Sequence, residues 1–456
     1  MKRLLCLAFL AILASMATAD DWHIETVDSV YDVGSHTSLA LDSSGNPHIS
    51  YYDDSNNNLK YAVWNGASWE LQTVNWTGVG RYTSLALDSS DHPHISHYDE
   101  TNDDLKYAAW TGVRWKQATV DSAGDVGYDT SLALDSSGRP RISYYDDSNG
   151  DLKYADWYAA WNGARWEIET VDSAGDVGVD TSLALDSSGN PHISYCDYSF
   201  HNSDLKYAAW NGSSWEIETV DSAGDVGLHT SLVLDSSGYP HISYKGNGDL
   251  KYAAWNGASW QIETVDSDVW VGNYSSLALD SSGNPHISYH DNLNEDLKYA
   301  AWNGSIWDIQ TVDSAGNVGA YTSLALDSAG NPHISYYDAT NKDLKFATTR
   351  PDWDIDNVEL TADAEDGGVM VGWTPTGDTP SSIHVLRGEE NHVAVSGSLG
   401  GDTTRWLDRG VEPGGSYVYW IEATDSDGYV KRFGPTEAVV VPEQTQRLAL
   451  DEPWPN

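Results

Sequence analysis

The chain has 456 residues, of which 69 are Asp or Glu and only 24 are Lys or Arg, giving a formal net charge of −45. A negative field of this size repels nucleic acid and anionic lipid surfaces, so we expect neither as a partner. It favours cations, basic proteins or neutral ligands such as glycans, unless the acidity serves only to keep the protein in solution.

The N-terminus has the composition of a secretory signal over residues 1–19. Lys2 and Arg3 precede an apolar run at 4–13, and Ala-Thr-Ala at 17–19 is a small-residue cleavage pattern. The run is too short to span a bilayer and no other stretch is long enough, so we expect no membrane insertion. After the signal, Cys196 is the only cysteine, and stability must come without an internal disulfide. The sequence predicts an exported monomer, secreted or held at the cell surface.

A Pro-His-Ile-Ser motif or a close variant recurs seven times. Its proline lies at Pro47, Pro93, Pro140, Pro191, Pro240, Pro285 and Pro332. A period of 45–51 residues with several short strands per repeat is typical of a β-propeller. Each repeat contains four strand-like runs, which in the sixth cover residues 277–280, 286–291, 297–302 and 307–312.

The ends of the repeat region predict how the ring closes. Residues 22–27 copy the fourth strand of a repeat but precede the first complete one, and the last repeat supplies only three strands. The N-terminal strand should complete the last blade, giving an all-β, seven-bladed propeller over residues 20–350 with few exposed strand edges. The second hairpin loops of the blades (292–295 in the sixth) and the blade-to-blade loops (267–270 before it) should share one face. We call this the variable face, because most differences between copies lie there.

A repeated lysine is expected to be structural. Asn247-Gly248 is a strong hairpin signal, and its register places a tyrosine opposite a lysine at Tyr244–Lys251, Tyr51–Lys60 and Tyr289–Lys298. The lysine recurs at Lys60, Lys106, Lys153, Lys206, Lys251, Lys298 and Lys345. We expect it to pair with two acidic columns that begin at Asp53 and Asn58.

A repeated histidine follows the motif proline in six copies, and Arg141 replaces it in the third. One histidine per blade cannot converge on a metal ion, so we interpret these residues as hydrogen-bonding groups between blades. The tryptophan pairs, such as Trp302 and Trp307, are expected to pack at the outer edges of the blades.

The repeat resembles bacterial secreted propeller repeats of the form S-L-A-L-D-x-x-G-x-P-H-I-S-Y-x-D. Residues 296–307 are similar to the aromatic and glycine segment of fucose-lectin-like and tectonin-like propellers, and the resemblance covers residues 22–349. It implies sugar binding between blades by aromatic rings together with an arginine and an acidic residue, although no arginine recurs in register here. The turn D-x-x-G differs from the D-x-G Asp-box of sialidases.

Residues 351–441 have a different pattern of alternating strands. The stretch Glu412-Pro-Gly-Gly-Ser-Tyr417-Val-Tyr resembles a motif of fibronectin type III domains, in which the tyrosine forms a corner. Residues 442–456 resemble a linker and the opening of the sorting domain used by type IX secretion, truncated at Asn456.

The candidate ligand-binding residues lie where the repeats differ. The residue before the Thr-Ser or Ser-Ser of each innermost strand should ring the central channel on the variable face: His36, Tyr82, Asp129, Asp180, His229, Tyr274 and Tyr321. Neighbouring loops add Trp76, Arg81, Tyr198, Phe200, His201 and Trp270. Aromatic rings with acidic groups suit glycan binding, because rings stack on sugars and polar groups give directional hydrogen bonds.

The leading hypothesis is therefore a non-catalytic, carbohydrate-binding recognition protein whose partner is a glycan. One alternative is an adhesin or protein-interaction scaffold that binds a surface protein. Another is a polysaccharide-cleaving glycosidase or lyase, which needs two carboxylates in unequal environments, with Asp129 and Asp180 as the candidates. We expect no cofactor; calcium remains a candidate ion, although no recognised ligand spacing is present.

Overall fold

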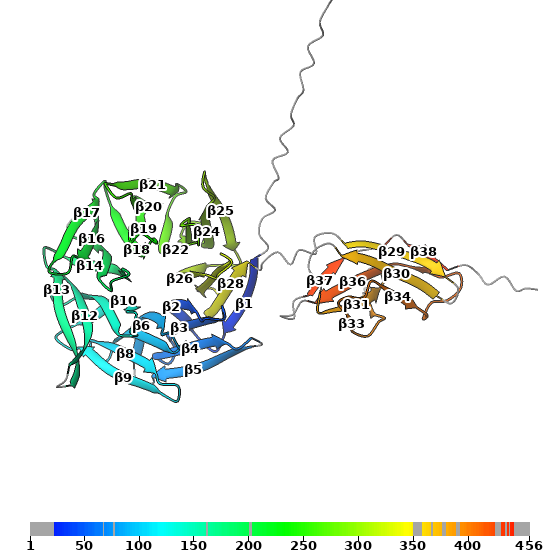
Figure 1. Ribbon diagram of the computed structural model, residues 1–456, viewed down its shortest axis with the longest axis horizontal. Helices are drawn as coiled ribbons and strands as arrows, with labels where there is room; N and C mark the ends of the chain where they lie inside the picture. The colour runs from blue at the N-terminus through cyan, green and yellow to red at the C-terminus, as the bar shows by residue number, and fades with distance from the viewer. Residues whose placement is uncertain are drawn as a thin grey trace, which may run out of the picture. The chain divides into compact units, whose positions relative to one another are not determined.

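The structure is a computed structural model of the chain. Its described residues fall into two compact units, one ending at Thr349 and the other following it (Figure 1). The described part contains no helix that could cross a membrane. The residues described are 22–66, 68–75, 78–160, 163–199, 203–349, 358–365, 368–375, 380–388, 393–424, 430–433, 436 and 438–441.

Within these residues, the first unit consists of seven four-stranded antiparallel sheets arranged as the blades of a β-propeller (Figure 1). Blades 1 and 2 comprise β2 (Val33–Leu41), β3 (Pro47–Asp53), β4 (Asn58–Trp64), β5 (Trp69–Asn75), β6 (Val79–Leu87), β7 (Pro93–Asp99), β8 (Asp104–Trp110) and β9 (Trp115–Asp121). Blades 3 and 4 comprise β10 (Val126–Leu134), β11 (Pro140–Asp146), β12 (Asp151–Ala160), β13 (Gly163–Asp172), β14 (Val177–Leu185), β15 (Pro191–Asp197), β16 (Asp204–Trp210) and β17 (Trp215–Asp221). Blades 5 and 6 comprise β18 (Val226–Leu234), β19 (Pro240–Gly246), β20 (Asp249–Trp255), β21 (Trp260–Asp266), β22 (Val271–Leu279), β23 (Pro285–Asp291), β24 (Asp296–Trp302) and β25 (Trp307–Asp313). Blade 7 comprises β26 (Val318–Leu326), β27 (Pro332–Asp338), β28 (Asp343–Thr349) and β1 (Trp22–Asp28).

The N-terminal strand completes the seventh blade, as the sequence predicts. β1 pairs antiparallel with β28, with Trp22 opposite Thr349 and Ile24 opposite Ala347. The strand order of this sheet is β1-β28-β27-β26. Because strands from both ends of the repeat region share one hydrogen-bonded sheet, the seven-bladed propeller and its closure are confirmed.

The predicted hairpin register is also confirmed, with Tyr244 opposite Lys251. The prediction was wrong for the innermost strand, which begins in blade 6 at Val271 and not at residue 277. The register of this strand shifts twice, between Val271 and Asn273 and between Asn273 and Ser276. These bulges interrupt the alternation of side chains, so the first half of the strand has no period of two that could reveal it.

The hydrophobic core lies between blades. In one cluster, Leu205 of blade 4 packs with Ile242 of blade 5, and each of the other clusters of this unit also joins two neighbours. The tryptophans pack at the outer ends, as expected. The ring of Trp307 lies 5.6 Å from that of Trp302 in its own blade and 5.6 Å from that of Tyr252 in blade 5.

The Thr-Ser pair of each innermost strand, which is Ser-Ser in blade 6, links neighbouring blades near the axis. In blade 2 the hydroxyl of Thr83 contacts that of Ser50 in blade 1, and the Leu85 N–H donates to Ser38 Oγ at 3.0 Å. The bond from a leucine N–H to the preceding blade's serine recurs around the ring, each time at 3.0 Å. The motif therefore joins the innermost strands directly.

A buried aspartate at the end of a blade's fourth strand binds the next blade. Asp266 of β21 accepts hydrogen bonds from Tyr289 and Lys298 of blade 6, both at 2.6 Å. Burial alone would raise the pKa of Asp266, but these donors outweigh it and hold the pKa below its usual value. The trio occurs as Asp28–Tyr51–Lys60, Asp121–Tyr144–Lys153, Asp172–Tyr195–Lys206, Asp221–Tyr244–Lys251, Asp266–Tyr289–Lys298 and Asp313–Tyr336–Lys345.

This trio corrects the predicted partners of the lysines. The columns that begin at Asp53 and Asn58 were expected to hold them, whereas in most blades the aspartate of the preceding blade makes the shorter contact. Lys345, for example, lies 2.8 Å from Asp313 of the preceding blade and 3.7 Å from Asp338 of its own. The repeat pattern did not predict this aspartate, because it precedes the lysine by 30–34 residues in the sequence and lies outside the hairpin from which the register was predicted.

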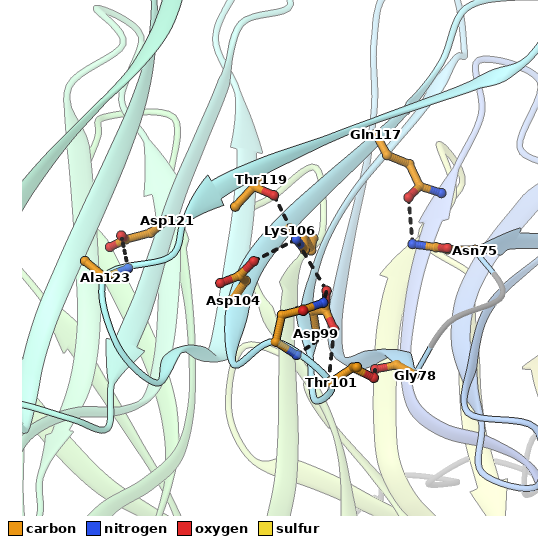
Figure 2. Close-up of polar contacts among 11 residues, drawn as sticks. Asn75, Gly78, Asp99, Thr101, Asp104, Lys106, Gln117, Thr119, Asp121 and Ala123 are labelled. Atoms are coloured by element: carbon orange, nitrogen blue, oxygen red, sulfur yellow. Dashed lines mark hydrogen bonds and ion pairs between the residues drawn. The ribbon is translucent and has the colours of Figure 1, made fainter.

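The interface between blades 1 and 2 lacks the trio. Asn75 stands in place of the aspartate and His97 in place of the tyrosine, and Lys106 lies 3.3 Å from Asp99 and 2.8 Å from Asp104, both in its own blade (Figure 2). His97 is fully buried, and neither of its ring nitrogens has a hydrogen-bond partner among the described residues. Burial lowers the pKa of His97 to about 3, although Asp99 opposes the shift.

The repeated histidines bond within their own blades, so the predicted role between blades is wrong. His286 Nδ1 contacts the Tyr299 hydroxyl, and His286 Nε2 lies 3.9 Å from Asp280, all in blade 6. In blade 3, Arg141 takes this place and lies 2.7 Å from Asp156. The histidine and its tyrosine lie on adjacent strands of one hairpin, which brings them together without help from a neighbouring blade.

The second unit is formed by short antiparallel strands. One sheet has the order β29-β30-β34, a second has β32-β31-β36-β37 with β33 beside β31, and β35 pairs with β38. The Tyr417 hydroxyl accepts a hydrogen bond from the Glu412 N–H at 2.9 Å, the contact of a tyrosine corner. The fibronectin type III assignment of 351–441 stays a prediction, and residues 1–19 and 442–456 lie outside the described part. The strands are β29 (Val358–Glu365), β30 (Gly368–Pro375), β31 (Ser382–Arg387), β32 (Val393–Ala394), β33 (Leu399–Gly400), β34 (Arg405–Asp408), β35 (Ser416–Tyr417), β36 (Tyr419–Thr424), β37 (Val430–Phe433) and β38 (Val439–Val440).

Restoring the missing trio should stabilise the propeller. In Asn75→Asp/His97→Tyr, the new carboxylate would accept hydrogen bonds from the new hydroxyl and from Lys106. We expect the free energy of unfolding, measured by urea denaturation, to rise by about 1–3 kcal/mol. The control Asn75→Asp/His97→Phe supplies the ring without the hydroxyl and should gain less. A restored variant no more stable than the parent chain would contradict the prediction.

Candidate functional site

Each innermost strand directs one residue toward the central channel. This residue lies within the bulge of the strand and has a positive φ of 48–55° in every blade. None of the seven is glycine, although this backbone region is unfavourable for other residues. A bulge re-aims a side chain out of the regular alternation of a strand. The same local geometry therefore positions His36, Tyr82, Asp129, Asp180, His229, Tyr274 and Tyr321.

These seven side chains meet at one cavity of about 220 Å³. The residue that follows each of them in sequence also lines the cavity: Thr37, Thr83, Thr130, Thr181, Thr230, Ser275 and Thr322. The structure thus brings seven of the predicted site residues together around the axis. Their role in binding stays a prediction.

One side of the cavity is formed by an aromatic arc, which consists of Tyr82, His36, Tyr321 and Tyr274 from blades 2, 1, 7 and 6. The ring of His36 lies 4.5 Å from that of Tyr82 and 4.4 Å from that of Tyr321, and Tyr274 lies 4.6 Å from Tyr321. These distances are those of favourable aromatic contacts. Burial, aided by the charge of Arg81, lowers the pKa of His36 to about 3, so the arc is uncharged at neutral pH.

The other side holds a carboxylate pair, Asp129 and Asp180, from blades 3 and 4. Asp129 Oδ2 accepts the Asp180 N–H at 2.9 Å, and Asp180 Oδ2 accepts the His229 N–H at 2.8 Å. His229 Nδ1 lies 3.6 Å from Asp180 Oδ1, and the His229 ring lies 4.8 Å from that of Tyr274. His229 therefore connects the carboxylate pair to the aromatic arc.

The pKa of Asp129 in the carboxylate pair is shifted from its ordinary value. Burial and the charge of Asp180 raise the pKa of Asp129 to about 7, against the opposing effect of the Asp180 N–H. Asp129 therefore keeps its proton to a higher pH than an ordinary aspartate does. Burial lowers the pKa of His229, although the neighbouring Asp180 favours its charged form. The arrangement can stack against an apolar face, accept hydrogen bonds and exchange a proton near pH 7.

The remaining predicted residues that the structure describes, Arg81, Tyr198 and Trp270, are not among the cavity's lining residues. Arg81 Nε lies 3.4 Å from Glu100, and its guanidinium group lies 5.4 Å from the centre of the Tyr52 ring. Tyr198 and Trp270 are 56% and 62% exposed. Trp76, Phe200 and His201 lie outside the described residues.

The prediction missed a second set of aromatic residues around the ring. The Tyr98 ring lies 6.3 Å from that of Tyr82 and 4.4 Å from that of Tyr128, and its hydroxyl donates to Asp125 at 2.8 Å. Tyr98 occupies the same place in its repeat as Cys196 does in the fourth repeat. The residue type at this place differs between repeats, and that variation could have identified these aromatic residues from the sequence. Cys196 is buried and burial raises its pKa, which argues against a nucleophilic role.

Three other features lie apart from this cavity. In the described part of the chain, no group of three or more His, Cys, Asp or Glu side chains could hold a metal ion. In blade 3, β12 and β13 are each ten residues long, whereas the matching strands of blade 4 have seven, and the added residues lie at the strand ends away from the variable face. A larger hollow of about 390 Å³ in the second unit contains Arg387 and Asp408, which bond to each other at 2.7 Å.

No protein-family model matches the chain, and no curated protein matches it in sequence. Among solved structures it is similar to an ulvan lyase of a polysaccharide lyase family, with a TM-score of 0.50, 14% identity and coverage of 72% of this chain and 94% of the lyase. The SapL1 lectin in complex with alpha-methyl fucoside gives a TM-score of 0.45, with 14% identity over 62% of this chain and 98% of the lectin. The Aleuria aurantia lectin in complex with alpha-methyl-L-fucoside gives a TM-score of 0.43 at 14% identity. The match covers 63% of this chain and 97% of the lectin. At this identity the likeness is one of fold, and it assigns no ligand to this chain.

Replacing Asp180 should change the titration of Asp129. In Asp180→Asn the neighbouring charge is lost, so the pKa of Asp129 should fall below about 7, while burial keeps it above the usual value for aspartate. Carbon-detected NMR of the side-chain carboxyl groups measures this shift. Asp147→Asn, an exposed residue outside the cavity lining, is the matched control and should leave the titration near 7. An unchanged titration in Asp180→Asn would show that the two carboxylates do not interact.

Proposed function

We propose that this protein is an exported, non-catalytic recognition protein that binds carbohydrate at the mouth of the propeller channel. The observation that carries this proposal is the shared cavity, in which the aromatic arc faces the carboxylate pair. In this proposal the second unit is a fibronectin type III-like spacer.

The two sides of the cavity supply the two interactions that a sugar uses. Tyr82, Tyr274 and Tyr321 offer apolar ring faces against the C–H groups of a sugar, while their hydroxyls and the carboxylates offer directional hydrogen bonds. At about 220 Å³ the cavity is smaller than the roughly 300–1,000 Å³ of typical sites for drug-sized ligands. It therefore suits one sugar unit of a longer glycan, whose remaining units would extend over the variable face.

Removing a tyrosine of the aromatic arc should weaken glycan binding. A glycan array probed with the full chain identifies the ligand, and titration calorimetry then compares the variants. We expect Tyr82→Ala, Tyr274→Ala and Tyr321→Ala each to lose affinity by about tenfold, about 1.4 kcal/mol. Tyr158→Ala is the matched control, because Tyr158 is an exposed tyrosine on the hairpin of the opposite face. Unaltered glycan binding in all three variants, or binding to a surface protein alone, would refute the proposal.

A second candidate function is cleavage of a polysaccharide. It is favoured by one observation, the carboxylate pair in which the pKa of Asp129 is raised to about 7 beside the charge of Asp180, because glycosidases use two carboxyl groups of unequal acidity. Product release from a panel of polysaccharides, lost in Asp180→Asn and kept in Asp147→Asn, would establish this function. Binding without product release from any of them supports the recognition role.

A further inference from the structure

The described lining of the cavity is acidic, although two cations lie near it. Asp129 and Asp180 line it, whereas no Lys or Arg is among its described lining residues. Two cations interact with lining residues over a longer range: Arg81 with His36, and Lys245 with His229 and Asp180. Arg81 pairs with Glu100 at 3.4 Å, and Lys245 belongs to β19, the second strand of blade 5. None of the described contacts is an ion pair between either cation and the two carboxylates of the cavity.

The carboxylate pair lines the cavity and has acceptor capacity that the described backbone contacts do not use. The backbone N–H groups use Oδ2 of each aspartate, and no described residue donates a hydrogen bond to Oδ1 of Asp129. Burial, together with the charge of Asp180 in the adjacent blade, favours the protonated form of Asp129. A cation between these two carboxylates and the aromatic arc would replace that proton as the neutralising group.

We propose that the group held in this cavity is the ammonium group of an amino sugar whose amine is free. This inference rests on the proposed carbohydrate recognition and adds the charge of the ligand. The aromatic arc strengthens the attraction, because a cation near the faces of several tyrosines interacts favourably with their ring quadrupoles. The net charge of −45 also concentrates cations at the surface.

The geometry favours this ligand over three others. A uronic acid or a sulfated sugar would place an anion beside Asp129 and Asp180 without a lining arginine to compensate. A metal ion would leave the four aromatic rings of the arc without an apolar ligand surface to contact. A lysine side chain is too slender to fill a cavity of about 220 Å³, whereas a sugar ring stacks on the arc while its amine reaches the carboxylates.

For both carboxylates to carry a negative charge beside the bound ammonium group, Asp129 must lose its proton when the ligand binds. Asp180 of blade 4 acts on Asp129, and the charge of Asp129 in turn raises the pKa of Tyr82 in blade 2 and of Tyr145 in its own blade. Below about pH 7 Asp129 is protonated and one negative charge is missing, so a cation of fixed charge should bind more weakly as the pH falls. Choline carries such a charge at all pH values and separates this effect from titration of the ligand.

The test compares two oligosaccharides of the same sugar backbone and linkage, one with free amines and one with acetylated amines that carry no charge. Titration calorimetry with the full chain at pH 7 uses the β-1,4-linked glucosamine tetramer and the N-acetylglucosamine tetramer of the same linkage. We expect the glucosamine tetramer to bind at least tenfold more tightly, and Asp180→Asn and Asp129→Asn each to remove about tenfold of its affinity. Asp147→Asn, which removes a charge outside the cavity lining, should have little effect. Choline should bind several-fold more tightly at pH 8 than at pH 5.5.

The outcomes separate this inference from the proposed function. Tight binding of neutral or acidic glycans with no preference for the amine overturns the ammonium assignment and leaves carbohydrate recognition intact. Binding of the glucosamine tetramer that survives both aspartate variants, or a lysine peptide that binds more tightly, also overturns it. No glycan binding of any kind defeats both proposals. Thermal unfolding of the variants without ligand shows whether they fold, and Asp180→Asn keeps an oxygen that can accept the His229 N–H.

Discussion

The buried aspartate that one blade inserts against the next is the interaction on which the ring depends. Placing a carboxylate such as Asp266 in the interior carries a large desolvation cost unless donors surround it. Tyr289 and Lys298 supply those donors from the next blade, so a displacement of either blade would leave a buried charge unpaired. The requirement fixes how neighbouring blades align. Between blades 1 and 2, Asn75 carries no charge, and Lys106 finds carboxylates in its own blade instead.

Blades held in this way present a constant frame to the axis. The hydroxyl contacts of the Thr-Ser pairs join the innermost strands, and the bulge in each strand sets the direction of one side chain. Because backbone geometry determines the position, the identity of that residue can differ between blades without altering the fold. Tyr82 and Asp129 occupy equivalent backbone positions in adjacent blades and give the cavity opposite chemistry.

The sequence allowed the ring to be predicted because its repeats are regular and its N-terminal strand duplicates a fourth strand. Asn247-Gly248 fixed the hairpin register for the same local reason. The errors concern contacts that no local pattern encodes. Lys298 reaches Asp266 in another blade, His286 stays within its own hairpin, and the bulged half of the innermost strand lacks alternation. The channel residues could be predicted because they occupy the same place in every repeat. The electrostatic interaction of Asp129 with Asp180 could not, because it depends on how two blades meet.

The order of the blades explains why the cavity has two distinct sides. Neighbours in the chain are neighbours in the ring, so the run of blades 6, 7, 1 and 2 forms a continuous aromatic arc, and blades 3 and 4 form a continuous carboxylate pair. A site between blades could recur around the ring, whereas a site on the axis is shared by all seven blades and exists once per molecule. A ligand with one apolar face and one hydrogen-bonding edge therefore has a single orientation in which both sides are satisfied. The seven channel residues share one backbone geometry but differ in their side chains. This difference gives the bound group a defined direction, which seven identical side chains could not do.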